Sequence, residues 1–198
     1  MLYYERIAKK QGYRFVIGVD EAGRGPLAGP VVAAAVVLRS ARFHNRVDDS
    51  KKLSALQRER AFREIVQQSF FGIGIVSEAV IDAINILEAT KQAMQKAIRQ
   101  VIERMPDPCA KMFVLIDGNC TVDVALPCAA IVKGDTKSLS IASASIVAKV
   151  TRDRIMAGYD RVYPHYGFIK HKGYPTKMHR EALITFGPSL IHRMSFLT

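Results

Sequence analysis

Short apolar runs alternate with longer amphipathic stretches along this chain, a pattern typical of an α/β protein. The short runs are rich in β-branched or small apolar residues, and none is long enough for a typical helix. They predict five strands, at Phe15–Asp20, Val31–Leu38, Phe70–Ser77, Met112–Asp117 and Ala129–Lys133. Only a turn dense in Gly and Pro separates the first two strands, so we expect them to pair as a hairpin.

Stretches with helical periodicity separate most of these strands. Ser54 is a candidate N-cap for a helix that runs to about Ser69. Its expected apolar stripe comprises Leu56, Phe62, Ile65 and Val66. The other helices are expected from about Val80 to Met105, from Ser138 or Ser140 to about Tyr163, around Thr176–Phe186 and after Pro188. This order of elements predicts one mixed sheet with helices on both faces, and no repeat or linker divides it.

The composition is that of a globular protein with a strong basic surplus. The chain has 198 residues, 49% of them hydrophobic, and its 29 Lys and Arg against 18 Asp and Glu give a formal net charge of +11. Such a surplus attracts polyanions, of which nucleic acid is the commonest. On charge alone, a basic surface that serves only solubility is equally compatible.

The sequence also favours a soluble, cytoplasmic protein. Cys109, Cys120 and Cys128 form no Cys-x-x-Cys pair, which argues against a disulfide framework or a structural zinc site. Residues 1–14 lack the apolar stretch of a signal peptide. The longest apolar run, Val31–Leu38, is far shorter than the roughly 20 residues of a membrane helix.

Acidic residues follow three of the predicted strands. Asp20 and Glu21 end the first, Asp117 ends the fourth, and Asp135 follows the fifth. Carboxylates beside buried strands are unfavourable unless a cation or hydrogen-bond donors satisfy them. Oxygen ligands without His or Cys suit Mg²⁺ or Mn²⁺, and two such ions about 3.5–4 Å apart would serve phosphodiester hydrolysis. The alternative is that each acid caps a turn or pairs with a nearby base.

Two geometric conditions apply to this hypothesis. The strands that end at Asp20 and Asp117 must be neighbours in the sheet. Adjacent residues of a strand point to opposite faces, so Asp20 and Glu21 converge only if the strand breaks at Glu21. The following Ala22 and Gly23 favour such a break.

The segment from Gly23 to Gly29 (GRGPLAG) is dense in glycine. It lacks the Gly-Lys-Ser/Thr ending of a P-loop. Its glycine spacing is GxGxxxG, whereas a dinucleotide-binding unit has GxGxxG, and a strand follows it where that unit has a helix. Beside paired acids, it favours close approach of backbone to a sugar-phosphate, with Arg24 meeting a phosphate.

A second candidate binding segment, Tyr163 to Thr176, interleaves aromatic and basic residues. Bases neutralise phosphates, and aromatic rings stack on sugars or nucleobases. A histidine-rich zinc site is the competing interpretation, although no thiolate or His-Glu-x-x-His pair supports it.

These motifs together resemble those of bacterial ribonuclease HII. The matching blocks run in the family's order, at Gly18–Val32, Asp49–Ser54, Ile116–Asn119, Lys133–Asp135 with Ser140–Asp153, and His171–Thr176. They span nearly the whole chain. One small departure is Ala142-Ser143-Ala144, where the family commonly has three alanines.

The resemblance implies a ribonuclease H-like catalytic domain at residues 1–163. It also implies a helical extension at 164–198 that contributes to substrate binding without folding independently. The implied metal-binding and catalytic residues are Asp20, Glu21, Asp117 and Asp135. The implied substrate-binding residues are Gly23, Arg24 and Gly25, which read a ribose 2′-hydroxyl, and Tyr174, which packs on the neighbouring sugar. Lys51, Lys52 and Lys172 are our further candidates for phosphate contacts.

The implied reaction is cleavage on the 5′ side of ribonucleotides, in RNA–DNA hybrids or embedded singly in duplex DNA. It uses two Mg²⁺ or Mn²⁺ ions and leaves 3′-hydroxyl and 5′-phosphate ends. A monomer with no obligate protein partner is expected. Ribonuclease HIII carries an additional N-terminal domain, for which the residues before the first strand leave no room. A catalytically silent nucleic-acid-binding module is the alternative of another class, but it explains four acids beside a polyanion poorly.

Overall fold

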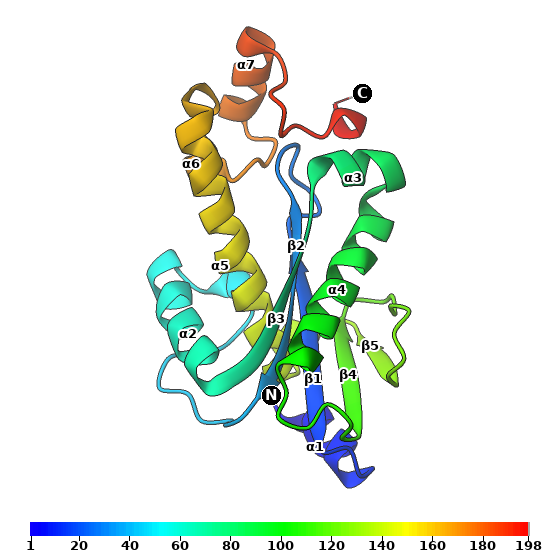
Figure 1. Ribbon diagram of the computed structural model, residues 1–198. Helices are drawn as coiled ribbons and strands as arrows, with labels where there is room; N and C mark the ends of the chain where they lie inside the picture. Colours follow the sequence, from blue (N-terminus) through cyan, green and yellow to red (C-terminus); the bar gives the residue numbers. More distant parts are fainter. Residues whose placement is uncertain (198) are drawn as a thin grey trace.

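A single mixed sheet of five strands organises the chain in this computed structural model, which describes residues 1–197 (Figure 1). The strands are β1 (Phe15–Ala22), β2 (Val31–Leu38), β3 (Ser69–Val76), β4 (Met112–Asp117) and β5 (Cys128–Ile131). Their order across the sheet is β3-β2-β1-β4-β5, in which β2 is antiparallel to β1 and β3, while β4 is parallel to β1 and β5. The expected mixed sheet and the hairpin are confirmed.

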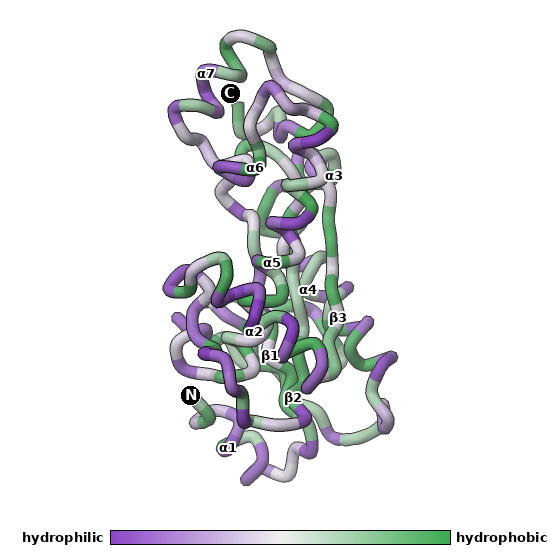
Figure 2. Tube along the Cα trace, turned by 90° about the vertical axis from the view of Figure 1, so that its left-hand side faces the viewer, coloured by the Kyte–Doolittle hydropathy of each residue, from purple (hydrophilic) through white to green (hydrophobic). Residues whose placement is uncertain are grey.

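Helices cover both faces of the sheet (Figure 1). The longer ones are α1 (Tyr3–Lys10), α2 (Ala55–Gln68), α3 (Glu78–Ile84), α4 (Ile86–Glu103), α5 (Leu139–Val162) and α7 (Lys177–Phe186). A short α6 (Phe168–His171) and four 3₁₀ turns complete the chain, at Ser50–Lys52, Gly134–Thr136, Pro164–Tyr166 and Met194–Phe196. Strand residues pack against α4 on one face. On the other face β2 and β3 pack against α2 and α5, while β4 and β5 pack against α1 and the start of α5. Apolar colour accordingly follows β2 and β3 through the middle of the molecule (Figure 2).

The parallel pairing of β1 with β4 positions the acids. Val19 lies opposite Ile116, so the two strands end side by side and carry Asp20 and Asp117 to the same edge of the sheet. The neighbouring strands that the metal hypothesis required are therefore present.

The end of β1 differs from the expectation. The strand does not break at Glu21, because the pairing with β2 continues to Ala22, opposite Val32. The break comes at Gly23, whose φ of +100° favours glycine. β5 is also displaced from the predicted Ala129–Lys133: it ends at Ile131, and Lys133 adopts the left-handed conformation at φ 55°.

The helices show three further differences. The single helix predicted from Val80 to Met105 is interrupted at Asn85, where φ is 68° and the side chain accepts hydrogen bonds from the Leu87 and Glu88 amides. The N-terminal α1 was not predicted. After Pro188 there is only a 3₁₀ turn, at Met194–Phe196, in place of an α-helix.

The start of α2 is as predicted, and so is its apolar stripe at Phe62, Ile65 and Val66, but not at Leu56. Ser54 forms a reciprocal capping box with Gln57. Leu56 is 61% exposed, whereas Ile65 is buried under the sheet. Nine residues at about 100° each turn Leu56 to the opposite side of the helix from Ile65, so Leu56 does not belong to the stripe.

The C-terminal residues pack on the outer end of α5 and on the β1–β2 loop (Figure 1). Their small core joins Met156 of α5 and Ala28 of the loop to Tyr166, Phe168 and Ile191. Whether residues 164–198 fold only with the rest of the chain stays a prediction, and Thr198 lies outside the described residues. In the described part of the chain, no helix has the length and apolar character needed to cross a bilayer.

Glycines let α4 lie directly against β3. A Cβ atom built at Gly74 would approach the Ala93 carbonyl oxygen to 1.9 Å, so no side chain fits there. We expect Gly74→Ala to lower the free energy of unfolding by about 2–3 kcal/mol or more, because backbone atoms must move apart. Chemical denaturation measures this. The matched control is Gly158→Ala in α5, where a Cβ meets open space, and there we expect a gain of up to about 1 kcal/mol from helix propensity. Equal stability of the two variants would contradict the packing argument.

Candidate active site

Three of the four predicted acids line one cleft of about 270 Å³ at the ends of β1 and β4. By strand alternation, Asp20 and Asp117 face α5, whereas Glu21 faces α4, and all three line this cleft. Asp135 lies outside its lining, in the 3₁₀ turn after β5. The cleft thus brings together three of the four predicted acids, even though β1 does not break at Glu21.

The charges of these acids are poorly compensated. Burial, followed by repulsion from Glu21 and Asp117, raises the pKa of Asp20 well above its ordinary value, and only 5% of this residue is exposed. Burial also raises the pKa of Glu21, which Arg24 partly opposes from 3.4 Å. The pKa of Asp135 is raised by burial and then by repulsion from Asp117. Mutual repulsion of buried carboxylates favours a cation among them.

Hydrogen bonds hold the acids in place from the neighbouring elements. The Gly134 amide donates to Oδ1 of Asp117 at 2.6 Å, which ties the Asp135 turn to the end of β4. A hydrogen bond from Ser145 of α5 counteracts the rise in the pKa of Asp20. The Ser145 and Ser50 hydroxyl oxygens are 2.9 Å apart in the interior, so α5 also holds the turn that carries Lys51.

The donor atoms of the cleft fit a hard divalent cation, since they are carboxylate oxygens with little counter-charge. Across residues 1–197, however, no three His, Cys, Asp or Glu side chains already lie in a metal-binding arrangement. The acids would therefore have to change rotamer to bind an ion together. Asp135 is repelled by Asp117 but does not line the cleft with the other three acids.

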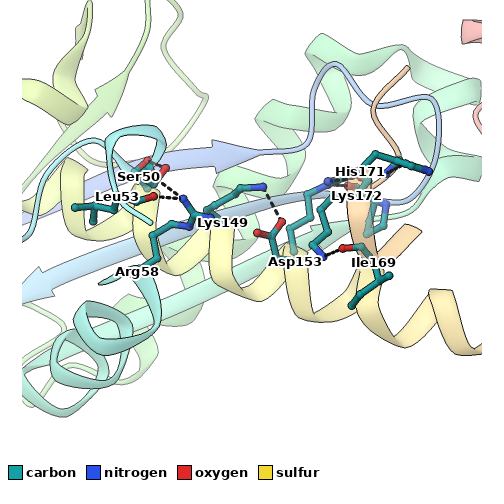
Figure 3. Close-up of polar contacts among 12 residues, drawn as sticks. Ser50, Leu53, Arg58, Lys149, Asp153, Ile169, His171 and Lys172 are labelled. Carbon is teal, nitrogen blue, oxygen red and sulfur yellow. Dashed lines mark hydrogen bonds and ion pairs between the residues drawn. The ribbon is translucent and has the colours of Figure 1, made fainter. Parts of the chain in front are cut away.

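The predicted substrate-binding residues fall into two groups. Gly23, Arg24, Gly25, Lys51 and Tyr174 line the cleft with the acids. A Cβ at Gly25 would lie 3.8 Å from the Tyr174 ring, so the glycine turn and the ring border the same space. The other group lies outside the lining: Lys52 pairs with Asp48 at 3.6 Å, and the Lys172 ammonium donates to the Ile169 carbonyl (Figure 3).

Two residues that support the site, Arg58 and Lys149, were not predicted (Figure 3). Arg58 of α2 donates to the carbonyls of Ser50 and Leu53 and so fixes the Lys51 turn. Lys149 lines the cleft and forms an ion pair at 2.7 Å with Asp153, one helical turn further along α5. The spacing of four residues between Lys149 and Asp153 was a usable signal in the sequence. The contacts of Arg58 and Ser50 depend on tertiary structure and had no such signal.

Comparison with known proteins identifies the family of this chain. The family model for ribonuclease HII matches residues 17–198. The chain belongs to the ribonuclease HII family. A relative described as ribonuclease HII from Syntrophus aciditrophicus is 52% identical over 197 residues, which cover 99% of this chain and 90% of the relative. The family identifies the chain as a ribonuclease H, a metal-dependent endonuclease.

Solved structures support the ribonuclease H-like fold. The ribonuclease HII of a complex with PCNA from Archaeoglobus fulgidus superposes with a TM-score of 0.72 at 27% identity, covering 91% of this chain and 94% of that one. Bst-RNase HIII, solved in complex with Mn²⁺, superposes with a TM-score of 0.68. It is only 15% identical, covers 92% of this chain and 67% of that one, and shows the fold alone.

The buried histidines of this ribonuclease HII chain form a hydrogen-bonded stack. The Nε2 atoms of His179 and His192 are 2.9 Å apart, and the His171 and His179 rings stack at 4.5 Å. Their other nitrogens contact backbone groups, among them the Tyr174 carbonyl, 3.0 Å from Nδ1 of His179. Each ring is thus held as one neutral tautomer. The arrangement gives no support to the competing zinc hypothesis.

This stack predicts acid sensitivity. Burial and then the neighbouring His179 lower the pKa of His192 to about 4, and burial lowers the pKa of His171 and His179 as well. Between about pH 6.5 and 4 the unfolded chain therefore binds protons that the folded chain does not, so stability falls as pH falls. For His192 the loss approaches about 1.4 kcal/mol per pH unit within this range. Urea denaturation across this range measures the free energy of unfolding at each pH. In His192→Gln this free energy should depend less steeply on pH. An unchanged slope in that variant would contradict the assignment.

Proposed function

We propose that this enzyme cleaves the phosphodiester on the 5′ side of ribonucleotides, both in RNA–DNA hybrids and where a single ribonucleotide is embedded in duplex DNA. The products would carry 3′-hydroxyl and 5′-phosphate ends. One observation carries the proposal: three acids, the Gly23–Gly25 turn and the Tyr174 ring border one cleft. The acids that would bind the catalytic metal ions therefore lie beside groups that can contact a single sugar of the substrate. Membership of the ribonuclease HII family supports it.

The four acids are assigned the metal-binding role. Asp20, Glu21 and Asp117 supply carboxylate oxygens from the cleft, and Asp135 joins them through the turn that Asp117 holds. Two Mg²⁺ or Mn²⁺ ions, when bound, would activate a water molecule and stabilise the leaving oxygen. The acids contribute by holding negative charge at a buried site that has few other counter-ions.

The remaining residues of the cleft are assigned to the substrate. The Gly23–Gly25 turn approaches a ribose closely because its glycines carry no side chain, and Arg24 lies within reach of a phosphate. Tyr174 is 42% exposed and presents its ring to the adjoining sugar. Lys51 faces the acids: burial disfavours its charge, but Asp49 and then Asp20 and Asp135 raise its pKa. It is thus charged for a phosphate contact.

The test is cleavage of three labelled duplexes, each with and without a chelator. They contain an all-DNA strand, a single ribonucleotide and a continuous RNA strand. We expect metal-dependent cuts 5′ of ribonucleotides in the last two and none in the all-DNA duplex. Binding without cleavage in the presence of Mg²⁺ or Mn²⁺ would favour the silent binding module. We also propose that the enzyme acts as a cytoplasmic monomer without an obligate protein partner.

The lysines give a prediction on salt dependence. Lys51→Ala should lower the slope of log affinity against log salt by about 0.9, the value of one phosphate contact on duplex DNA. Fluorescence anisotropy with a catalytically inactive background measures it. Lys52→Ala and Lys172→Ala test the other two predicted phosphate contacts in the same way. Slopes unchanged in all three variants would show that these lysines make no phosphate contact.

A further inference from the structure

Arg193, a buried arginine near the C-terminus, forms hydrogen bonds with the backbone of the Gly23–Gly25 turn. Arg193 is 0% exposed and donates four hydrogen bonds to backbone carbonyls of the β1–β2 loop. Its Nη2 lies 2.6 Å from the Gly23 oxygen, and its Nη1 lies 2.9 Å from the Arg24 oxygen. Nε and Nη2 both contact the Gly29 oxygen, at 2.9 and 2.7 Å. The guanidinium is thus hydrogen-bonded to the start of the β1–β2 loop at Gly23 and Arg24 and to its end at Gly29.

No carboxylate of residues 1–197 forms a salt bridge with this guanidinium at 4.0 Å or less. Glu78 and Asp82 attract the charge from beyond this distance, and the centroid of the Phe196 ring lies 5.1 Å from the guanidinium carbon. A buried cation without an ion pair is unfavourable, and the dipoles of the carbonyls that the guanidinium contacts help to stabilise its charge. The positive charge therefore acts on the peptide groups of the turn.

These contacts fix the direction of two amides. In a trans peptide the C=O and N–H bonds of one unit point in opposite directions, and every described peptide bond is trans. Because the Gly23 and Arg24 carbonyls point at Arg193, the Arg24 and Gly25 N–H groups point away from it, on the side where this turn lines the cleft. Within residues 1–197, neither amide donates to a protein acceptor. A cation on the carbonyl side also strengthens each N–H as a donor.

We propose that Arg193 is the positioning residue of the sugar-reading turn, holding the Arg24 and Gly25 amides toward the 2′-oxygen of the bound ribonucleotide. This inference rests on the proposed function, because it assumes that the turn inspects a ribose. It assigns to the C-terminal segment a part in specificity that needs no direct contact with the substrate.

The matched control is Arg152 of α5, which is also buried and also bonded to carbonyls. It donates to Ala28, Pro30 and Lys172, at 3.0, 3.0 and 2.9 Å, and not to the Gly23 or Arg24 carbonyl. Replacing either arginine removes a buried guanidinium and leaves carbonyls unpaired. Only Arg193 variants release the two peptide units that carry the reading amides.

The experiment compares Arg193→Lys and Arg193→Met with Arg152→Lys and Arg152→Met. For each we would measure kcat/KM on duplexes with one ribonucleotide or one 2′-fluoro nucleotide, since fluorine is the weaker acceptor. The wild type should prefer the ribonucleotide. The Arg193 variants should lose about three- to tenfold of that preference, the contribution of a hydrogen bond, with Lys retaining more than Met. The Arg152 variants should keep the preference even where they are less active.

A second readout needs no catalysis. In the metal-free protein, Arg193→Lys should move the Arg24 and Gly25 amide resonances upfield and speed their hydrogen exchange, whereas Arg152→Lys should not. Unchanged preference and unchanged resonances in the Arg193 variants would overturn the inference. So would unfolding of both Arg193 variants while the Arg152 variants fold. A wild type without any ribonucleotide preference would instead overturn the proposed function.

Discussion

Asp20→Asn is expected to lower phosphodiester cleavage by at least about 10³-fold while the substrate still binds. The substitution keeps the size of the side chain but removes one metal-ligating charge, and metal stabilisation of the transition state amounts to several kcal/mol. Binding should be equal or tighter, because a negative charge leaves a cleft that faces phosphate. Single-turnover cleavage and fluorescence anisotropy measure the two effects. Asp117→Asn should behave in the same way, since its side chain lines the same cleft.

The matched control is Asp107→Asn, an exposed residue whose carboxylate pairs with Arg14 at 2.7 Å far from the cleft. It should cleave normally. A further readout separates lost chemistry from lost folding. The raised pKa of Asp20 means that its charge destabilises the metal-free fold at neutral pH, so Asp20→Asn should melt at a higher temperature than the wild type. Mg²⁺ or Mn²⁺ should then raise the melting temperature of the wild type more than that of the variant. Near-normal activity at saturating Mg²⁺ in both Asp20→Asn and Asp117→Asn would contradict the two-metal assignment.

The strands of this fold were predictable because each is a short apolar run bounded by Gly, Pro or charge. The ranges expected for β2 and β4 are those of the structure. Helix boundaries were less accessible. The interruption at Asn85 depends on one residue that tolerates a positive φ and caps the next helix, and helical periodicity on both sides conceals it.

The site was predictable in its residue types but not in its geometry. Asp20 and Asp117 were candidates because each ends a buried strand, yet their proximity depends on the order β1-β4, which periodicity does not encode. Alternation along β1 suggested that Glu21 would need a strand break to join Asp20. The structure shows that a cleft at the sheet edge takes side chains from both faces. Arg193 had no signal at all, since its role depends on contacts across more than 160 residues of sequence.

Substitution of Tyr174 is expected to change which substrates the enzyme cleaves. Its backbone is held on both sides, by the His171 carbonyl at 2.9 Å from its amide and by His179 at 3.0 Å from its carbonyl, while its ring remains 42% exposed beside Gly25. A rigid ring in this place packs well on a deoxyribose, which has no 2′-hydroxyl in the way. We therefore expect Tyr174→Ala to lose about tenfold or more in activity on a single embedded ribonucleotide, and Tyr174→Phe to lose less, since packing of the ring supplies most of the contact.

The assay compares kcat/KM on the single-ribonucleotide duplex with that on a continuous RNA–DNA hybrid, where each neighbouring sugar carries a hydroxyl. The loss in Tyr174→Ala should be larger on the first substrate, and the thermal stabilisation by Mn²⁺ should be unchanged because the acids are untouched. Tyr3→Ala, an exposed tyrosine of α1, is the matched control and should leave both activities unchanged. Equal losses on the two substrates would show that Tyr174 does not read the junction. If the wild type cuts hybrids but not a duplex with a single ribonucleotide, the junction-reading mechanism is contradicted. The assignment as a metal-dependent endonuclease would be unaffected.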